Sequence, residues 1–208
     1  PRNPADDGLA RSAREALRQL ADGAELEIRL AAAAPDRYGR LRAQLLRADN
    51  GLWLQAALLR AGHVQVFTTP ETAAAAAALY AAEDEARQSR RGLWASARYR
   101  PASAERVERP AGRYTIVRGR VREATKVGGT LYLNFGEDWR EDFTLRLPWD
   151  ARRRFPKARR EADWWTGRQL EMRGMLESYN GPMITASHPA EIRLLVVTQE
   201  PAAGARAR

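Results

Sequence analysis

The pattern of apolar and polar positions predicts a mixture of helices and strands in the first hundred residues. Apolar residues recur at helical spacing over 9–20, and they alternate with charged residues over 26–30, which is typical of a half-buried strand. The pattern further predicts a strand over 40–47, a helix over 52–62 that ends at Gly62, a short strand over 64–67 and a long helix over 70–91.

The second half of the chain has the pattern of a small barrel. We expect strands over 114–123, 130–135, 142–147, 169–176 and 182–186, with a basic helix over 151–160 between the third and the fourth. Gly128-Gly129 and Asn180-Gly181 are signals for hairpin turns. Strands, then a helix, then two more strands is the element order of an OB-fold, so we predict an OB-like barrel.

Polar sequence without periodicity, bounded by Pro101, Pro110 and Gly112, separates the two halves. We therefore predict a first domain over 1–98, a linker over 99–111, a second domain over 112–197 and a disordered tail over 198–208. The fold class that follows is α+β or mainly β. Residue 1 is Pro rather than Met, so we expect that sequence upstream of it has been removed.

Composition restricts the kinds of partner. No run of 18 apolar residues exists, so membrane insertion is not expected, and the absence of cysteine leaves the compartment open. The formal net charge is +9, and all basic residues except Lys126 and Lys157 are arginine. This charge favours polyanionic partners, DNA or RNA among them, although a biased gene composition would also produce many arginines.

The stretch from Asp36 to Ser96 carries the most informative motifs. It opens with Asp-Arg-Tyr-Gly-Arg-Leu at 36–41, continues with Trp-Leu-Gln-Ala-Ala-Leu-Leu-Arg-Ala-Gly at 53–62, and closes with Arg-Gly-Leu-Trp-Ala-Ser at 91–96. This order resembles the second half of staphylococcal-nuclease-like domains, the thermonuclease family, whose members cleave the DNA and RNA backbone with a calcium ion. The resemblance implies that Arg40 is a catalytic arginine and that Arg37 and Tyr38 assist in binding a phosphate.

The first half of the family's domain has no counterpart in the sequence. In the family, the calcium aspartates, the general-base glutamate and another arginine lie upstream of the first helix, so the resemblance implies a barrel without its first three strands. We expect no metal ligand and no cofactor in this chain, and calcium only if the missing carboxylates exist upstream. Strands supplied by a partner, or self-association, would cover the exposed edges. The resemblance suggests a secreted or periplasmic bacterial protein, and the cytoplasm stays open.

Candidate nucleic-acid contacts in the second half are basic or aromatic. The basic candidates are Arg152, Arg153, Arg154, Lys157, Arg159 and Arg160, which form a dense run that would bind phosphates or would simply be a solvated helix face. Tyr132 and Trp139 are candidate stacking platforms, while aromatic residues of a barrel also fill its core. Period-two spacing places Leu131, Leu133 and Phe135 on one face and Tyr132 on the other.

Two hypotheses on function follow. The first is a thermonuclease-family protein that acts on or binds the phosphodiester backbone of DNA or RNA, preferentially single-stranded, and is inactive over these 208 residues. If the full protein were active, it would be a calcium-dependent phosphodiesterase. The alternative is a non-catalytic nucleic-acid-binding or scaffolding protein that retains the nuclease-like fold.

Overall fold

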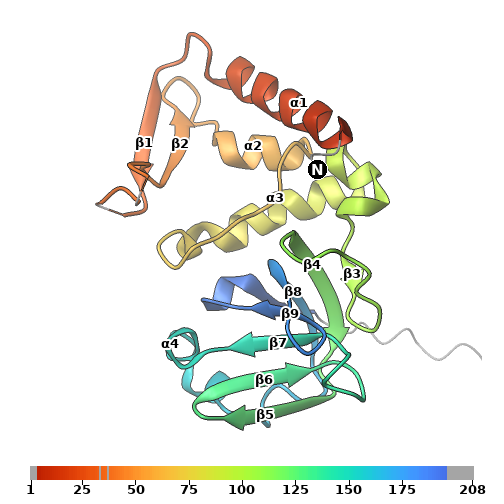
Figure 1. Ribbon diagram of the computed structural model, residues 1–208. Helices are drawn as coiled ribbons and strands as arrows, with labels where there is room; N and C mark the ends of the chain where they lie inside the picture. Colours follow the sequence, from red (N-terminus) through yellow and green to blue (C-terminus); the bar gives the residue numbers. More distant parts are fainter. Residues whose placement is uncertain (1–3, 33, 37, 196–208) are drawn as a thin grey trace, which may run out of the picture. The chain divides into compact units, whose positions relative to one another are not determined.

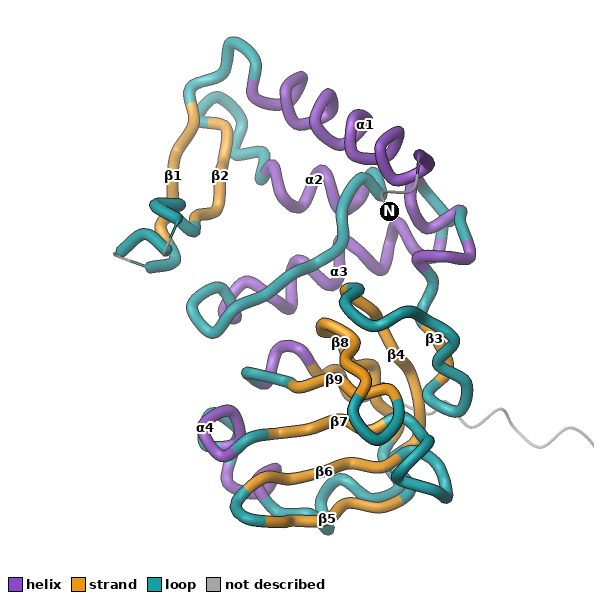
Figure 2. Tube along the Cα trace, in the orientation of Figure 1, coloured by secondary structure: helices purple, strands orange, loops and turns teal. Residues whose placement is uncertain are grey.

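The computed structural model describes residues 4–32, 34–36 and 38–195, and the chain divides into two compact units, Pro1–Arg100 and Pro101–Arg208. Helices dominate the first unit and strands dominate the second (Figure 2). The α+β architecture that the sequence predicts is therefore confirmed. The predicted tail, 198–208, lies outside the described residues.

The first unit consists of helices and one β-hairpin (Figure 1). Its elements are α1 (Pro4–Ala21), β1 (Leu26–Leu30), β2 (Ala43–Arg47), α2 (Leu54–Arg60), η1 (Ala73–Ala75), α3 (Ala76–Gln88), η2 (Gly92–Ala95) and η3 (Ala97–Tyr99). Helix α2 packs against α1 and α3. Their apolar faces and η2 form the core of this unit, with Leu58, Leu79 and Trp94 buried.

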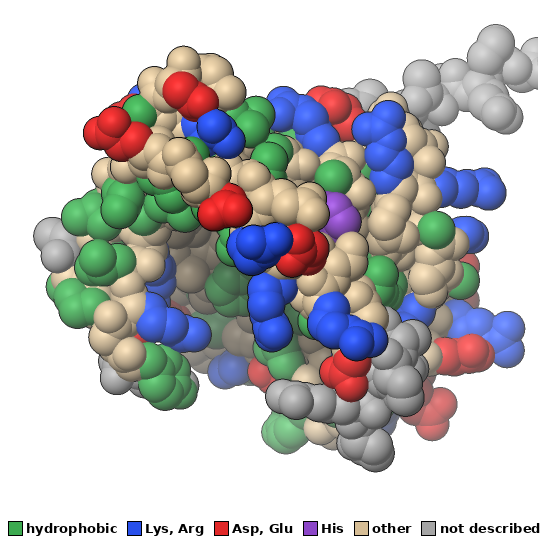
Figure 3. Space-filling model, turned by 90° about the horizontal axis from the view of Figure 1, so that it is seen from above, with side chains coloured by type: hydrophobic (Ala, Val, Ile, Leu, Met, Phe, Trp, Pro, Cys, Tyr) green, Lys and Arg blue, Asp and Glu red, His purple; other side chains and the backbone are tan. Residues whose placement is uncertain are grey.

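Strands β1 and β2 pair in antiparallel fashion, with Ile28 opposite Leu45. We expected β1 to be half-buried, but four of its five residues are exposed. Ile28, Leu30 and Leu41 are each more than half exposed, and apolar side chains gather over this hairpin in Figure 3. The difference arises because, among the described residues, β1 pairs only with β2 and no other strand extends this sheet.

Two glycines fix the connections at the ends of α2 and α3. The N–H of Gly62 donates to the Leu59 carbonyl and that of His63 to the Leu58 carbonyl, which is the hydrogen-bond pattern of a Schellman motif and confirms the predicted end of α2. Gly62 has φ +74° and Gly92 has φ +54°. A Cβ atom on Gly62 would lie 2.3 Å from the Arg91 carbonyl oxygen, and one on Gly92 would lie 2.2 Å from that of Gly62.

The predicted strand over 64–67 is wrong. Its backbone N–H at Val66 donates to the Glu83 carboxylate at 2.6 Å instead of to a neighbouring strand. Glu83 lies on α3, is completely buried and also forms an ion pair with Arg87 at 3.1 Å. This carboxylate thus ties an irregular segment to the helix, which periodicity along the sequence does not reveal.

The long helix predicted over 70–91 is shorter than expected. The Thr72 hydroxyl accepts a hydrogen bond from the Thr69 N–H at 2.8 Å, so these residues form a turn and regular helix begins only at η1 and α3. At the other end, α3 stops at Gln88 and Arg90 adopts a left-handed conformation with φ 51°. Both ends are therefore set by local turns.

The second unit is built from strands. Its elements are β3 (Ala102–Ser103), β4 (Tyr114–Arg120), β5 (Glu123–Val127), β6 (Thr130–Asn134), β7 (Thr144–Leu147), α4 (Trp149–Arg152), η4 (Lys157–Arg160), β8 (Gln169–Ser178), β9 (Pro182–Thr185), η5 (Pro189–Glu191) and β10 (Ile192–Leu194). The strand order is β3-β4-β8-β9-β7-β6-β5, and β10 pairs with β8. The predicted linker range, 99–111, therefore includes β3, which pairs with β4.

Strand β4, second in this order, and strand β5, last in it, are consecutive along the chain. Only Val121 and Arg122 separate β4 from β5. The Val121 N–H donates to the Arg168 carbonyl at 2.9 Å, and the Arg122 N–H donates to the Asn134 carbonyl at 2.9 Å. Within the described residues, no ladder joins the outermost strands β3 and β5, so the sheet is not closed. The element order and the parallel pairing of β7 with β9 are consistent with an OB-like fold.

The predicted faces of β6 are confirmed. Leu131, Leu133 and Phe135 are buried in the core of this unit, whereas Tyr132 and Asn134 are half-buried on the other face. The strand predicted over 114–123 is confirmed over Tyr114–Arg120 as β4, but it ends earlier than predicted, because the chain changes pairing partner at Val121–Arg122 and continues as the separate strand β5.

The basic helix predicted over 151–160 is also wrong. Two short helical segments, α4 and η4, replace it, with Pro156 between them. Proline has no N–H to donate, and it disfavours helical geometry at the residue before it, here Phe155.

In the described part of the chain, no helix is both long and apolar enough to cross a membrane.

Candidate nucleic-acid interface

The loop between β1 and β2 presents Arg40. The Asp36 carboxylate organises this loop, because its Oδ1 accepts hydrogen bonds from the backbone N–H of Tyr38 at 2.9 Å and of Arg40 at 3.0 Å. The Asp36 N–H donates in turn to the Arg40 carbonyl at 2.9 Å. Gly39, with φ 75°, allows the chain to reverse direction between these residues. The motif is therefore a turn that hydrogen bonds among its own residues close.

The Arg40 guanidinium has a fixed orientation and is also exposed to solvent. Its Nη2 and Nε lie 2.8 and 2.9 Å from Asp36 Oδ2, and its side chain is 71% exposed. The hydrogen bond from the Arg40 side chain, followed by those from the backbone, lowers the pKa of Asp36 to about 2. The guanidinium also lies over the exposed ring of Tyr38, 4.9 Å from its centroid. Asp36 therefore stays ionised near neutral pH and holds Arg40 in place.

Two further arginines, Arg37 and Arg42, lie near Arg40 in the sequence. Arg37 lies outside the described residues. Arg42, which follows the motif, forms an ion pair with Glu71 at 3.3 Å and so joins this loop to the turn that precedes η1. That ion pair was not expected from the sequence, since the two residues lie on separate segments.

The residues present do not fit the calcium site that the family resemblance implies. Over residues 4–32, 34–36 and 38–195, no three or more His, Cys, Asp or Glu side chains gather in a way that could hold a metal ion. Calcium requires six to eight oxygen ligands, several of them carboxylates. No step of a reaction is therefore assigned to a metal.

In the second unit, the structure brings Tyr132 and Trp139 together in a cavity of about 470 Å³. Tyr132 comes from β6, and Trp139 from the loop after it, where Trp139 is 48% exposed. Tyr179, which is 69% exposed, lines the same cavity and was missed by the sequence analysis. The signal that could have found it is the Asn180-Gly181 turn, because Tyr179 directly precedes it.

The predicted basic run does not form one exposed surface. Arg152 is only 3% exposed and lies 5.0 Å from the ring of Trp149, so its inclusion as an accessible nucleic-acid contact is wrong. Arg160 donates to the backbone carbonyls of Phe155 and Arg153, and Arg159 lies over Trp164. Arg153, Arg154 and Lys157 are exposed.

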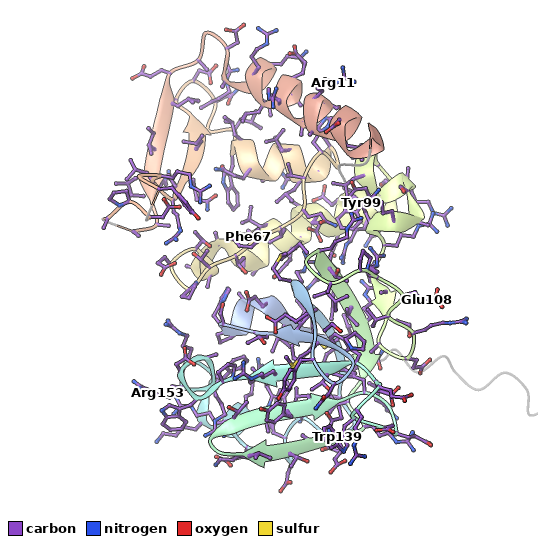
Figure 4. All side chains as sticks on the ribbon, in the orientation of Figure 1. Arg11, Phe67, Tyr99, Glu108, Trp139 and Arg153 are labelled. Carbon is purple, nitrogen blue, oxygen red and sulfur yellow. The ribbon has the colours of Figure 1, made fainter. Side chains whose placement is uncertain are left out.

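Figure 4 shows Arg153 beside α4 and Trp139 at the opposite end of the second unit. Arg153 therefore lies away from the Trp139 end of the cavity.

The match to known proteins concerns the first unit. The model of the staphylococcal nuclease homologue family matches residues 4–96, a range that includes α1, the Arg40 loop and η2. No curated protein matches the chain. Over residues 4–96, the chain is thus similar to the staphylococcal nuclease homologue family.

Proposed function

We propose that this protein binds the phosphodiester backbone of DNA or RNA and that Arg40 is a phosphate contact in its first unit. The observation that carries this proposal is the exposed guanidinium that Asp36 holds in a fixed orientation. Arginine presents a planar set of N–H donors that matches phosphate oxygens, and orientation before binding lowers the entropic cost of the contact. The net charge of +9 adds long-range attraction to any polyanion.

Single-stranded nucleic acid is the preferred form in this proposal. The Tyr38 ring is 66% exposed beside the guanidinium. A ring in this position can stack on a base only if that base is not already stacked inside a duplex. Arg37, Arg153, Arg154 and Lys157 stay predictions as further phosphate contacts.

Binding without hydrolysis is the form of the proposal that the site supports. The described residues bring together no group of three or more His, Cys, Asp or Glu side chains that could hold a calcium ion. This favours the non-catalytic alternative for the 208 residues. Incubation with calcium and denatured DNA, followed by electrophoresis, provides the check, and cleavage that a chelator abolishes would overturn it.

The direct test measures binding of a fluorescein-labelled single-stranded oligonucleotide by anisotropy over a series of salt concentrations. Arg40→Ala should weaken binding several-fold at low salt and make the slope of log K against log salt about 0.7 less steep, because one phosphate contact is lost. Arg29→Ala is the matched control, since Arg29 is 61% exposed and is paired with Glu27 in the same hairpin. Equal effects of the two variants would mean that only net charge matters and would refute the role of Arg40.

A further inference from the structure

We propose that the cavity lined by Tyr132, Trp139 and Tyr179 in the second unit binds the nucleobases of a single-stranded nucleic acid. This inference rests on the proposed function for the identity of the ligand, but it concerns a different site in a different unit. The Arg40 loop contacts the charged backbone, whereas this cavity receives the uncharged rings. A cavity of about 470 Å³ is within the range that binds small ring systems.

Two loops in close contact hold the rings. A Cβ atom on Gly181 would lie 2.7 Å from the Glu141 carbonyl oxygen and 2.8 Å from that of Asp142, so the turn after Tyr179 packs directly on the end of the loop that carries Trp139. That loop is itself closed, because the Asp142 side chain accepts from the Asp138 N–H at 2.8 Å. The loops that carry Trp139 and Tyr179 are therefore held by contact with each other and by a hydrogen bond within the Trp139 loop.

The polar groups of the cavity match the edge of a base. Glu123 on β5 lies directly opposite Asn134 on β6. Asn134 Oδ1 accepts from the Thr144 hydroxyl at 3.1 Å, which leaves its NH₂ group as a donor. Glu123 Oε1 accepts from the Thr125 hydroxyl at 3.1 Å, and its second oxygen remains an acceptor. A neighbouring donor and acceptor are complementary to the edge of any nucleobase, so we expect little sequence preference.

The distribution of charge separates bases from phosphates. Among the described residues that line the cavity, the carboxylate of Glu123 carries the formal charge and no Lys or Arg is present. A phosphate inside would meet a like charge. Arginines instead occupy neighbouring positions: the Arg140 guanidinium lies 4.7 Å from the centroid of the Trp139 ring, and Arg146 is opposite Tyr132 in the β6–β7 register. Accessible aromatic rings with arginines beside them are the arrangement that binds single strands with bases inward.

The experiment compares two oligomers of equal length and charge, one of thymidine nucleotides and one of abasic nucleotides. The full chain and its Trp139→Ala and Tyr179→Ala variants are titrated with each oligomer. Each variant should bind the thymidine oligomer about tenfold more weakly, because a stacking contact is lost, and should bind the abasic oligomer within about twofold of the unmodified chain. Trp149→Ala is the control, since Trp149 is 54% exposed but does not line the cavity.

The outcomes distinguish this inference from the proposed function. Arg40→Ala should weaken the binding of both oligomers equally, because both contain phosphates. If Trp139→Ala and Tyr179→Ala leave thymidine binding unchanged while Arg40→Ala weakens it, the cavity proposal fails and the proposed function stands. Equal losses for both oligomers would also overturn the cavity proposal, because the rings would then contact the backbone. Melting temperatures close to that of the unmodified chain are expected, since Trp139 is 48% exposed and Tyr179 is 69% exposed.

Discussion

Asp36 and Arg40 show how a short motif can prepare a side chain for binding. The carboxylate satisfies two backbone N–H groups with one oxygen and the guanidinium with the other. The loop therefore keeps its shape through contacts among its own residues, and the charged group it presents stays 71% exposed. The sequence identifies the motif through its resemblance to a family, but the reason for the aspartate, which is to fix the arginine, becomes visible only in the structure.

The first prediction concerns the titration of Asp36. Its pKa of about 2 is below the usual 3.8, so its interactions stabilise the folded loop fully above about pH 4 and are lost as the pH falls through about 2. Carboxyl carbon shifts measured by NMR should give a midpoint near 2. In Arg40→Ala the midpoint should rise, because the largest cause of the shift is removed, and it should stay below the usual value because the backbone hydrogen bonds remain. A midpoint at or above 3.8 in the unmodified chain would contradict the ion pair.

At the scale of elements, the least expected contact is the buried carboxylate of Glu83 on α3. It binds the Val66 N–H and Arg87, and Arg87 in turn lies over the Trp94 ring at 4.6 Å. A completely buried charge is tolerated only when it is paired and hydrogen-bonded. This network connects the irregular segment after α2 with α3 and η2.

The second prediction compares two glutamates of α3. Glu83→Ala should lower the free energy of unfolding of the first unit by about 3–5 kcal/mol, because the Val66 N–H and the Arg87 guanidinium lose their buried partner. Glu85→Ala should cost less than about 1 kcal/mol, since Glu85 is 54% exposed in its pair with Arg60. Urea denaturation followed by circular dichroism measures both. Similar losses in the two variants would show that burial of Glu83 does not matter.

Local patterns in the sequence account for much of the secondary structure but not for its connections. Alternation correctly identifies β1 and the two faces of β6, and Gly62 correctly marks the end of α2. The segment 64–67 misleads because its alternating apolar residues suggest a strand, whereas its hydrogen-bond partner is a side chain far along the chain. Strand β5 is missed because the boundary with β4 is a change of partner and not a change of composition.

The sequence also reveals one candidate site and not the other. Arg40 could be found because its motif is continuous in the sequence. The cavity could not be found from Tyr132 and Trp139 alone, because Tyr179 reaches it through the pairing of β9 with β7 and the contact of Gly181 with the preceding loop. The prediction that Arg152 is accessible is wrong, since composition does not distinguish a buried arginine from an exposed one.

At the scale of the whole molecule, each unit contributes one proposed contact to the same kind of ligand. The Arg40 loop belongs to Pro1–Arg100 and the aromatic cavity to Pro101–Arg208. Linked sites of modest affinity bind a ligand that reaches both much more tightly than either site alone. Two contacts of different chemistry would thus be sufficient for useful affinity without a large interface in either unit.

The third prediction follows from this linkage. The affinity for thymidine oligomers should rise steeply once their length suffices to occupy both sites, by tenfold or more, and then level off. Arg40→Ala and Tyr179→Ala should each flatten this rise, whereas Arg29→Ala should retain it. Anisotropy titrations with oligomers of increasing length provide the measurement. The same rise in all variants would indicate that the two sites do not act together on one strand.

The contact between Gly62 and Gly92 has a consequence for how this sequence can vary. Gly62 leaves room for the Arg91 carbonyl, and Gly92 leaves room for the Gly62 carbonyl. In both cases a larger residue would collide with backbone atoms. No compensating change elsewhere can create space, because a peptide group cannot be made smaller. The segment between the two glycines, which contains α3, is therefore joined at its two ends by a contact between backbone atoms. The exposed residues of α3 can therefore vary in sequence, whereas we expect Gly62 and Gly92 to be retained together.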